Sequence, residues 1–208
     1  MTSPQNFDKP RDDLPTITTW ARVALTLALV PLGISTLRDP QGWLPFISDI
    51  DLAVHEFGHN LFMPFGIPIL GRTMVILGGS LFQVVFPLIF VGYFLLSKKH
   101  RDPHAAMVCL WWTCISLADV AVYVGDARAR DLTLLDGLTG KESDGHDWYN
   151  LLSQWGVLKR DLIYASRTRT VARLMLWSST LGGLWFAIMA PRPKSQTESN
   201  GLSAKGPT

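Results

Sequence analysis

The segment His-Glu-Phe-Gly-His at residues 55–59 holds the residue types best suited to metal chemistry in this chain. Side chains four residues apart share one face of an α-helix, so His55 and His59 can both bind one metal ion. Glu56 would then lie beside that ion, where its carboxylate can take a proton from bound water. The motif therefore predicts a zinc site with Glu56 as the catalytic base.

A catalytic zinc site needs a third protein ligand, because it keeps its fourth position for water. Our first candidate is Asp119, the single charge in an otherwise apolar segment. Coordination to a cation would offset the desolvation cost of a carboxylate deep in such a segment. Asp119 could instead pair with Arg22, hydrogen-bond Gln83 or stay protonated. The predicted metal ligands are therefore His55, His59 and Asp119.

Other histidine and acidic side chains are alternatives for the third ligand. His146, in a Gly-His-Asp sequence, is the second candidate, and Asp147 could orient its imidazole. His146 could equally be a solvated loop residue. Asp136, in a Leu-Asp-Gly sequence, is the third candidate. Asp51 could orient an imidazole of the motif, and Asp126 could end a helix or support a ligand from behind.

Small residues in and after the motif indicate close helix packing. Gly58 costs about 1 kcal/mol of helix propensity relative to Ala, which is tolerable if another backbone approaches the metal closely. Gly78, Gly79 and Ser80 would let a neighbouring helix pack tightly against the site. Gln83, one turn further on, could contact a substrate backbone or form an interhelical hydrogen bond.

Four segments are apolar enough to cross a bilayer, which requires about 20 mostly apolar residues in a helix. They cover residues 20–37, 73–96, 105–124 and 174–190. Tryptophans near segment ends are typical of residues at a membrane surface. We therefore expect an all-α, polytopic membrane helical bundle with four to five spans.

The segment that carries the motif, residues 46–67, differs from these four. It is apolar overall but contains Asp49, Asp51 and the charged and polar side chains of the motif itself. Such groups are too costly to face lipid, so the helix must bury them against protein or water. It is either a fifth span inside the bundle or a shorter re-entrant helix, ended by Pro64 and Gly66.

Polar segments flank and interrupt the membrane domain, which we place at residues 20–190. Residues 1–19 form a polar N-terminal segment. Residues 191–208, rich in Ser, Lys, Pro and Gly, predict a disordered tail. Residues 126–170 are expected to form an extramembrane loop.

Within this loop, Asp147 could cap a helix that begins at Trp148. Apolar residues recur there at helical spacing, namely Trp148, Leu151, Leu152, Trp155 and Leu158. The stripe predicts either an interfacial helix lying on the bilayer or a helix packed onto the bundle.

Charge and cysteine content exclude or limit other functions. The net charge is +2 and no basic stripe with interleaved aromatics occurs, which excludes nucleic-acid binding. Cys109 and Cys114 lie in an apolar segment, where we expect buried thiols. The basic residues at 98–101 predict a cytoplasmic loop by the positive-inside rule. His100 and His104 beside it are expected to be solvated.

The motif on a membrane helix resembles the site-2 protease family of intramembrane zinc metalloproteases, the M50 peptidases. Residues 54–59 match that family's motif in its His, Glu, Gly and His positions. A longer pattern, which adds residues 77–83 and 119–128, is similar to small bacterial M50-like membrane proteins. The resemblance implies both motif histidines as ligands, Glu56 as catalytic base and an aspartate in a later membrane segment as third ligand.

The chain departs from the family pattern around that aspartate. The family's Leu-Asp-Gly context occurs at Asp136, which follows charged residues in a polar loop, whereas Asp119 is followed by Val120. The family's Asn-x-x-Pro element is absent before either aspartate. The identity of the third ligand therefore stays open at this point.

The leading functional hypothesis is a zinc-dependent intramembrane endopeptidase that hydrolyses a peptide bond with metal-activated water. We expect its partners to be the lipid bilayer and a membrane-protein or peptide substrate, and its location to be the bacterial inner (plasma) membrane. Two alternatives compete with this hypothesis. One is a non-catalytic M50-like binding or regulatory protein with a structural metal, and the other is a metal transporter.

Overall fold

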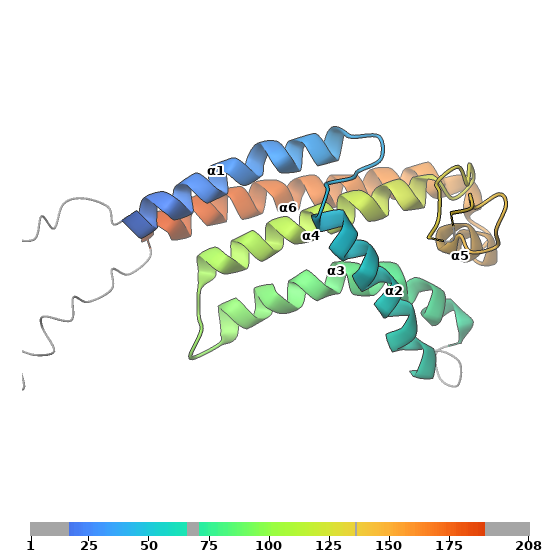
Figure 1. The fold of residues 1–208 in the computed structure, drawn as a ribbon, viewed down its shortest axis with the longest axis horizontal. Coiled ribbons are helices and arrows are strands. Elements are labelled where there is room, and N and C mark those ends of the chain that lie inside the picture. The colour runs from blue at the N-terminus through green and yellow to red at the C-terminus, as the bar shows by residue number, and fades with distance from the viewer. Residues whose placement is uncertain (1–16, 66–70, 136, 190–208) are drawn as a thin grey trace, which may run out of the picture.

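The structure, a computed structural model, describes residues 17–65, 71–135 and 137–189. Its elements in these residues are helical, and a single isolated bridge joins Thr133 to Thr139 (Figure 1). In chain order they are α1 (Ile17–Arg38), α2 (Ile47–Phe65), α3 (Arg72–Leu96), α4 (Pro103–Gly125), α5 (Asp147–Gln154), the 3-10 helix η2 (Leu158–Arg160) and α6 (Asp161–Met189). The all-α fold class predicted from the sequence is confirmed.

Four of the helices in the described part of the chain are long and apolar enough to cross a membrane. They comprise α1, α3, α4 and a stretch of 32 residues, Leu158–Met189, that contains α6. The first three agree with the predicted spans to within a few residues. The last begins well before the predicted residue 174, because arginines at 167 and 173 interrupt its apolar pattern while pointing to the exposed side of the helix.

Helix α4 is central to the bundle. It packs most extensively against α6, and α1 and α3 also lie against it (Figure 1). Trp111, Cys114, Ile115 and Ala118 of α4 form a buried apolar cluster with Leu176 of α6 and other buried residues. Both cysteines are free thiols, with Cys114 buried and Cys109 half-buried.

The motif helix α2 is not one of the four candidate spans. It has 19 residues, starts beside the middle of α4 and runs obliquely to the start of α3, which then returns along α4 (Figure 1). Its acidic and polar residues, and not its length, set it apart from the four, so the fifth span and the re-entrant helix both stay predictions. Pro64 lies in its last turn, and Gly66 falls outside the described residues.

The two ends of the bundle carry different parts of the chain. The start of α1, the end of α6 and the α3–α4 connection lie at one end, and α5 lies at the other with the loop after α4 (Figure 1). Asp102 in the α3–α4 connection caps α4 by accepting hydrogen bonds from the backbone N–H groups of His104 and Ala105. The predicted N-terminal segment and C-terminal tail lie outside the described residues, apart from the first residues of α1.

Helix α5 packs onto the bundle. Leu151 and Leu152 are fully buried, and the Trp148 Nε1–H donates a hydrogen bond of 3.0 Å to the Ser80 hydroxyl of α3. Leu151 and Leu152 of the stripe therefore pack onto the bundle, whereas Trp155 is exposed, and a position of the helix on the bilayer stays a prediction. The cap of this helix is His146, whose Nδ1 accepts from the Tyr149 backbone N–H. The predicted cap, Asp147, is instead the first helical residue.

His104 is buried, contrary to the expectation that it would be solvated. Its Nε2 lies 3.1 Å from the Thr26 hydroxyl and 3.2 Å from the backbone oxygen of Arg22, both on α1. Arg22 in turn forms an ion pair of 2.7 Å with Asp102. These contacts join α1 to α4. His100 is exposed, as expected.

Candidate metal centre

Close contact between α2 and α3 positions the two motif histidines. A Cβ atom added to Gly58 would lie 2.5 Å from the backbone oxygen of Gly78, so only glycine lets the two helices approach this closely. A Cβ atom on Gly79 would lie 2.5 Å from Nε2 of both His55 and His59. The close helix packing predicted from the small residues is therefore present. Gly79, which has no side chain, leaves open the space in front of the two imidazoles.

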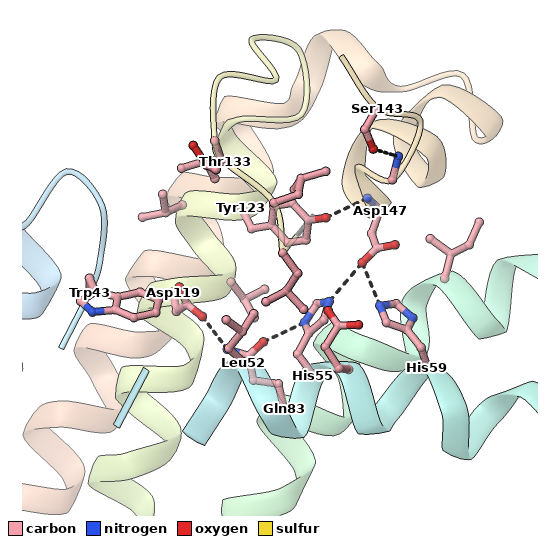
Figure 2. A pocket seen from close by; sticks show the side chains of 18 of the residues that line it. Trp43, Leu52, His55, His59, Gln83, Asp119, Tyr123, Thr133, Ser143 and Asp147 are labelled. Carbon is pink, nitrogen blue, oxygen red and sulfur yellow. Dashed lines mark hydrogen bonds and ion pairs between the residues drawn. The ribbon is translucent and has the colours of Figure 1, made fainter. Parts of the chain in front are cut away.

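The side chain that faces both imidazoles is Asp147, at the start of α5. Its Oδ2 atom lies 3.1 Å from His55 Nε2 and 3.1 Å from His59 Nε2 (Figure 2). Among the described residues, His55, His59 and Asp147 form the group of side chains whose ligand atoms all lie within 4.8 Å of one another. Two imidazole nitrogens and a carboxylate oxygen are a donor set that suits Zn²⁺.

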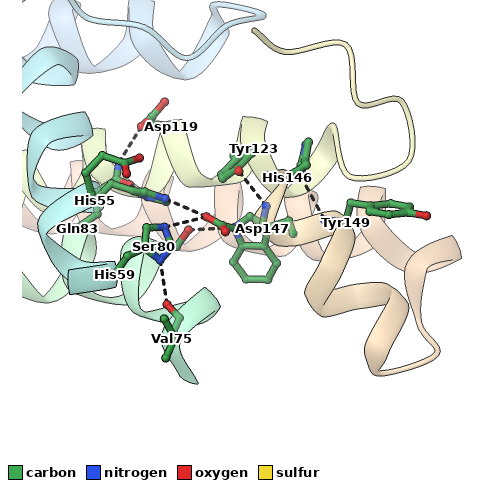
Figure 3. A network of polar contacts seen from close by, with 12 residues as sticks. His55, His59, Val75, Ser80, Gln83, Asp119, Tyr123, His146, Asp147 and Tyr149 are labelled. Carbon is green, nitrogen blue, oxygen red and sulfur yellow. Dashed lines mark hydrogen bonds and ion pairs between the residues drawn. The ribbon is translucent and has the colours of Figure 1, made fainter. Parts of the chain in front are cut away.

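Each imidazole is oriented through its other nitrogen. His59 Nδ1 lies 2.8 Å from the backbone oxygen of Val75, and His55 Nδ1 lies 3.0 Å from Gln83 Oε1 (Figure 3). Both partners are acceptors, so each Nδ1 carries a hydrogen. With each Nδ1 engaged in this way, each Nε2 faces Asp147, where a proton can be shared with the carboxylate or where both Nε2 lone pairs and the carboxylate can bind one cation. The residues present therefore fit a bound zinc ion.

Asp147 is held in place by α4 and by its neighbour in the chain. Its backbone N–H donates a hydrogen bond of 2.9 Å to the Tyr123 hydroxyl. The His146 ring packs against the Tyr123 ring (Figure 3). Its Nε2–H donates to Asp126 Oδ2 at 3.1 Å. Asp126 also accepts from the backbone N–H of Leu132. These contacts fix the loop that delivers Asp147 to the two histidines.

The two motif histidines keep the Asp147 carboxyl ionised. Burial alone would raise the pKa of the Asp147 carboxyl, but hydrogen bonds with His55 and His59 outweigh it and lower the pKa. Burial lowers the pKa of His146, against the opposing effect of its hydrogen bond with Asp126. A neutral His146 can cap α5 and donate to Asp126 at the same time.

A cavity of about 680 Å³ lies against the group. It is lined by His55, His59 and Asp147, by Glu56, by Asp119 and Tyr123 of α4, and by apolar side chains that include Trp43, Leu52, Val75, Ile76, Val120 and Leu135 (Figure 2). Glu56 therefore shares one cavity with the three candidate ligands. The arrangement combines a metal-binding group, a carboxylate and an apolar space large enough for several side chains.

The structure does not bring Asp119, the first candidate for the third ligand, to the two Nε2 atoms. Asp119 Oδ2 instead accepts a hydrogen bond of 2.7 Å from Gln83 Nε2. Asp119 is on α4, which faces the Nδ1 side of His55, and Gln83 lies between them. The place expected for Asp119 is taken by Asp147. Its alternative pairing with Arg22 is not found, since Arg22 pairs with Asp102.

The other candidates lie outside the group. His146 caps α5 and binds Asp126 instead of facing the motif. Asp51 accepts hydrogen bonds from Trp112 Nε1 and from the Ser116 hydroxyl, at 2.8 and 2.9 Å, and so ties α2 to α4 without orienting an imidazole. Asp126 lies at the end of α4, as one alternative had it. Asp136 falls outside the described residues.

The sequence predicts Asp147 only as a helix cap or as a partner of His146. The signal that could have found it was an acidic residue at the start of an amphipathic helix, since such a helix packs its apolar side against the bundle.

No family model matches the chain, and comparison with curated proteins and with solved structures finds no match either.

Proposed function

We propose that this protein is a zinc-dependent intramembrane endopeptidase of the M50 type. The observation that carries the proposal is the meeting of His55, His59 and Asp147 at one point of a cavity that also holds Glu56. Zinc is the proposed cofactor because the donor set consists of two imidazoles and a carboxylate. The motif of two histidines around a glutamate on a helix supports the same conclusion.

The chemistry would divide between the ion and Glu56. A bound zinc ion supplies a Lewis acid and lowers the pKa of water bound to it. The Glu56 carboxylate would accept a proton from the attacking water and return it to the nitrogen of the departing amine. Its position next to His55 in the chain and on the wall of the same cavity supports this role. Asp147 and the histidines would hold the ion.

The proposed substrate is a membrane protein or a peptide with an apolar segment. Support comes from the apolar side chains that line much of the cavity and from α3 and α4, two of the four apolar helices, which contribute residues to its wall. The protein is a membrane protein by these helices, and we propose the bacterial inner (plasma) membrane as its location. Selection of the substrate would then take place at the cavity, between α2, α4 and the loop that follows α4.

The first test is the zinc content of the full chain purified in detergent without chelator. We expect about one zinc ion per chain, lost in His59→Ala because two ligands hold the ion poorly. His100→Ala is the matched control, since His100 is exposed and far from the group along the chain. A wild-type chain that takes up no zinc, even when zinc is offered, would overturn the proposal.

The second test separates an enzyme from a protein with a structural metal. Glu56→Gln should keep the zinc and abolish cleavage of a co-reconstituted membrane-protein substrate, because glutamine cannot accept the proton. Cleavage that persists in Glu56→Gln, or that is absent from the zinc-loaded wild type across a panel of such substrates, would favour the binding or regulatory alternative. Zinc flux into liposomes would favour the transporter.

A further inference from the structure

A chain of hydrogen bonds leads from α4 through α3 to the motif helix. Asp119 Oδ2 accepts from Gln83 Nε2 at 2.7 Å, and Gln83 Oε1 lies 3.0 Å from His55 Nδ1 (Figure 3). The Gln83 side chain is only 2% exposed, so water does not compete for its amide. Three helices therefore contribute one residue each to a relay that ends on a candidate metal ligand.

The order of donors and acceptors along this relay follows from Asp119. Asp119 Oδ2 is the acceptor for Gln83 Nε2, so the amide of Gln83 turns its NH₂ group towards Asp119. The amide oxygen then faces His55, which must donate from Nδ1. The Nε2 lone pair of His55 is left directed at Asp147.

The other histidine needs no such arrangement. His59 Nδ1 faces the backbone oxygen of Val75, which can only accept. A glutamine side chain, in contrast, can present either its oxygen or its NH₂ group to an imidazole. Without Asp119 the amide of Gln83 could turn over and face His55 with a donor, which would favour the wrong tautomer.

We propose that Gln83 and Asp119 are positioning residues for the metal ligand His55, with Asp119 fixing the amide of Gln83 and Gln83 fixing the tautomer and orientation of the imidazole. The inference rests on the proposed zinc site and deepens it. It also assigns a function to Asp119, whose carboxylate does not itself reach the Nε2 atoms of the two histidines. Groups that orient metal-binding histidines in this way commonly change metal affinity by about 10–100-fold when they are removed.

The test compares zinc dissociation constants of the full chain in detergent, measured by competition with a chromophoric chelator. We expect Gln83→Leu to bind zinc about 10–100-fold more weakly. Asp119→Leu should also weaken binding, whereas Asp119→Asn should weaken it less, because the asparagine oxygen can still accept from Gln83 although its amide no longer enforces that orientation. The double variant Gln83→Leu/Asp119→Leu should bind no more weakly than Gln83→Leu alone, because Asp119 acts through Gln83.

Two further readouts separate positioning from general damage to the fold. The visible spectrum of the Co²⁺-loaded protein should change in Gln83→Leu, since it reports the geometry of the ligands. Asp51→Asn is the matched control, because Asp51 is a buried acid that contacts Trp112 and Ser116 instead of a histidine. We expect it to lower thermal stability without changing the spectrum.

The outcomes distinguish this inference from the proposed function. A wild type without zinc would overturn the proposed function. Normal zinc affinity and an unchanged Co²⁺ spectrum in folded Gln83→Leu would overturn the relay while leaving the metal site intact. Equal losses in Asp119→Asn and Asp119→Leu would also contradict it, because they would mean that the charge of Asp119 matters and not its hydrogen bond. If Gln83→Leu does not fold, the comparison of the two Asp119 variants decides.

Discussion

At the scale of single residues, the candidate site is divided between what is local in the sequence and what is not. His55 and His59 could be paired from the sequence because four residues along a helix bring two side chains to one face. Asp147 could not, because it is 88 residues after His59 and reaches the histidines through the packing of α5 and its preceding loop against α3 and α4. Asp119 was a candidate ligand because a carboxylate in an apolar segment has a high desolvation cost. In the structure its partner is the amide of Gln83 and not a metal-binding histidine.

The assignment of the third ligand leads to a direct comparison of two aspartates. Asp147→Asn should lose most of its zinc, because an amide is a poor zinc ligand and the negative charge of the carboxylate is removed. Asp119→Asn should retain it, since its partner is the amide of Gln83. Zinc per chain after gel filtration measures both. Retention by Asp147→Asn together with loss by Asp119→Asn would restore Asp119 as the third ligand.

At the scale of helices, the site depends on the contact between α2 and α3. The glycines predicted this contact correctly. Glycine in the middle of a helix lowers its stability, so its presence there indicates that a neighbouring group needs the space of the missing side chain. The sequence could not tell which neighbour would do so. At Gly58 it is the backbone of Gly78, and at Gly79 it is the pair of imidazoles.

Gly79 provides a test of this contact. Alanine has the better helix propensity by about 1 kcal/mol, so Gly79→Ala would stabilise an isolated helix. In the protein its Cβ would lie 2.5 Å from Nε2 of His55 and His59, so α3 or the imidazoles must move and we expect zinc binding to fall sharply. Zinc affinity and thermal unfolding in detergent report the two effects separately.

The matched control is on the same helix. A Cβ atom on Gly92 would meet nothing within 4 Å, so Gly92→Ala should bind zinc like wild type and be at least as stable. Should Gly79→Ala bind zinc as tightly as Gly92→Ala does, the space in front of the imidazoles would not be needed for the ion.

At the scale of the whole molecule, the sequence predicted the class of fold and most spans, because long apolar helices are a local property. It left two alternatives for α2. The direction of α2 in the bundle depends on packing, and only the packed bundle shows that α3 starts at the end where α1 finishes (Figure 1). The start of α6 was also missed, because exposed arginines occur within an otherwise helical segment.

This arrangement predicts which loops lie on the same side of the membrane. With four spans, the α3–α4 connection lies on one side and the loop between α4 and α5 on the other. The basic residues Lys98, Lys99 and Arg101 place the α3–α4 connection in the cytoplasm by the positive-inside rule. The end of the bundle that carries Asp147 would then face away from the cytoplasm.

Cysteine labelling tests this topology in a chain with Cys109→Ala and Cys114→Ala. His100→Cys and Asp144→Cys place single thiols at exposed positions in the two loops. In intact cells we expect a membrane-impermeant maleimide to label Asp144→Cys, and to label His100→Cys only after the membrane is permeabilised. Labelling of both from the same side would mean that α4 does not cross the membrane. Labelling with the sides exchanged would keep the four spans but place the site end of the bundle, with Asp147, in the cytoplasm.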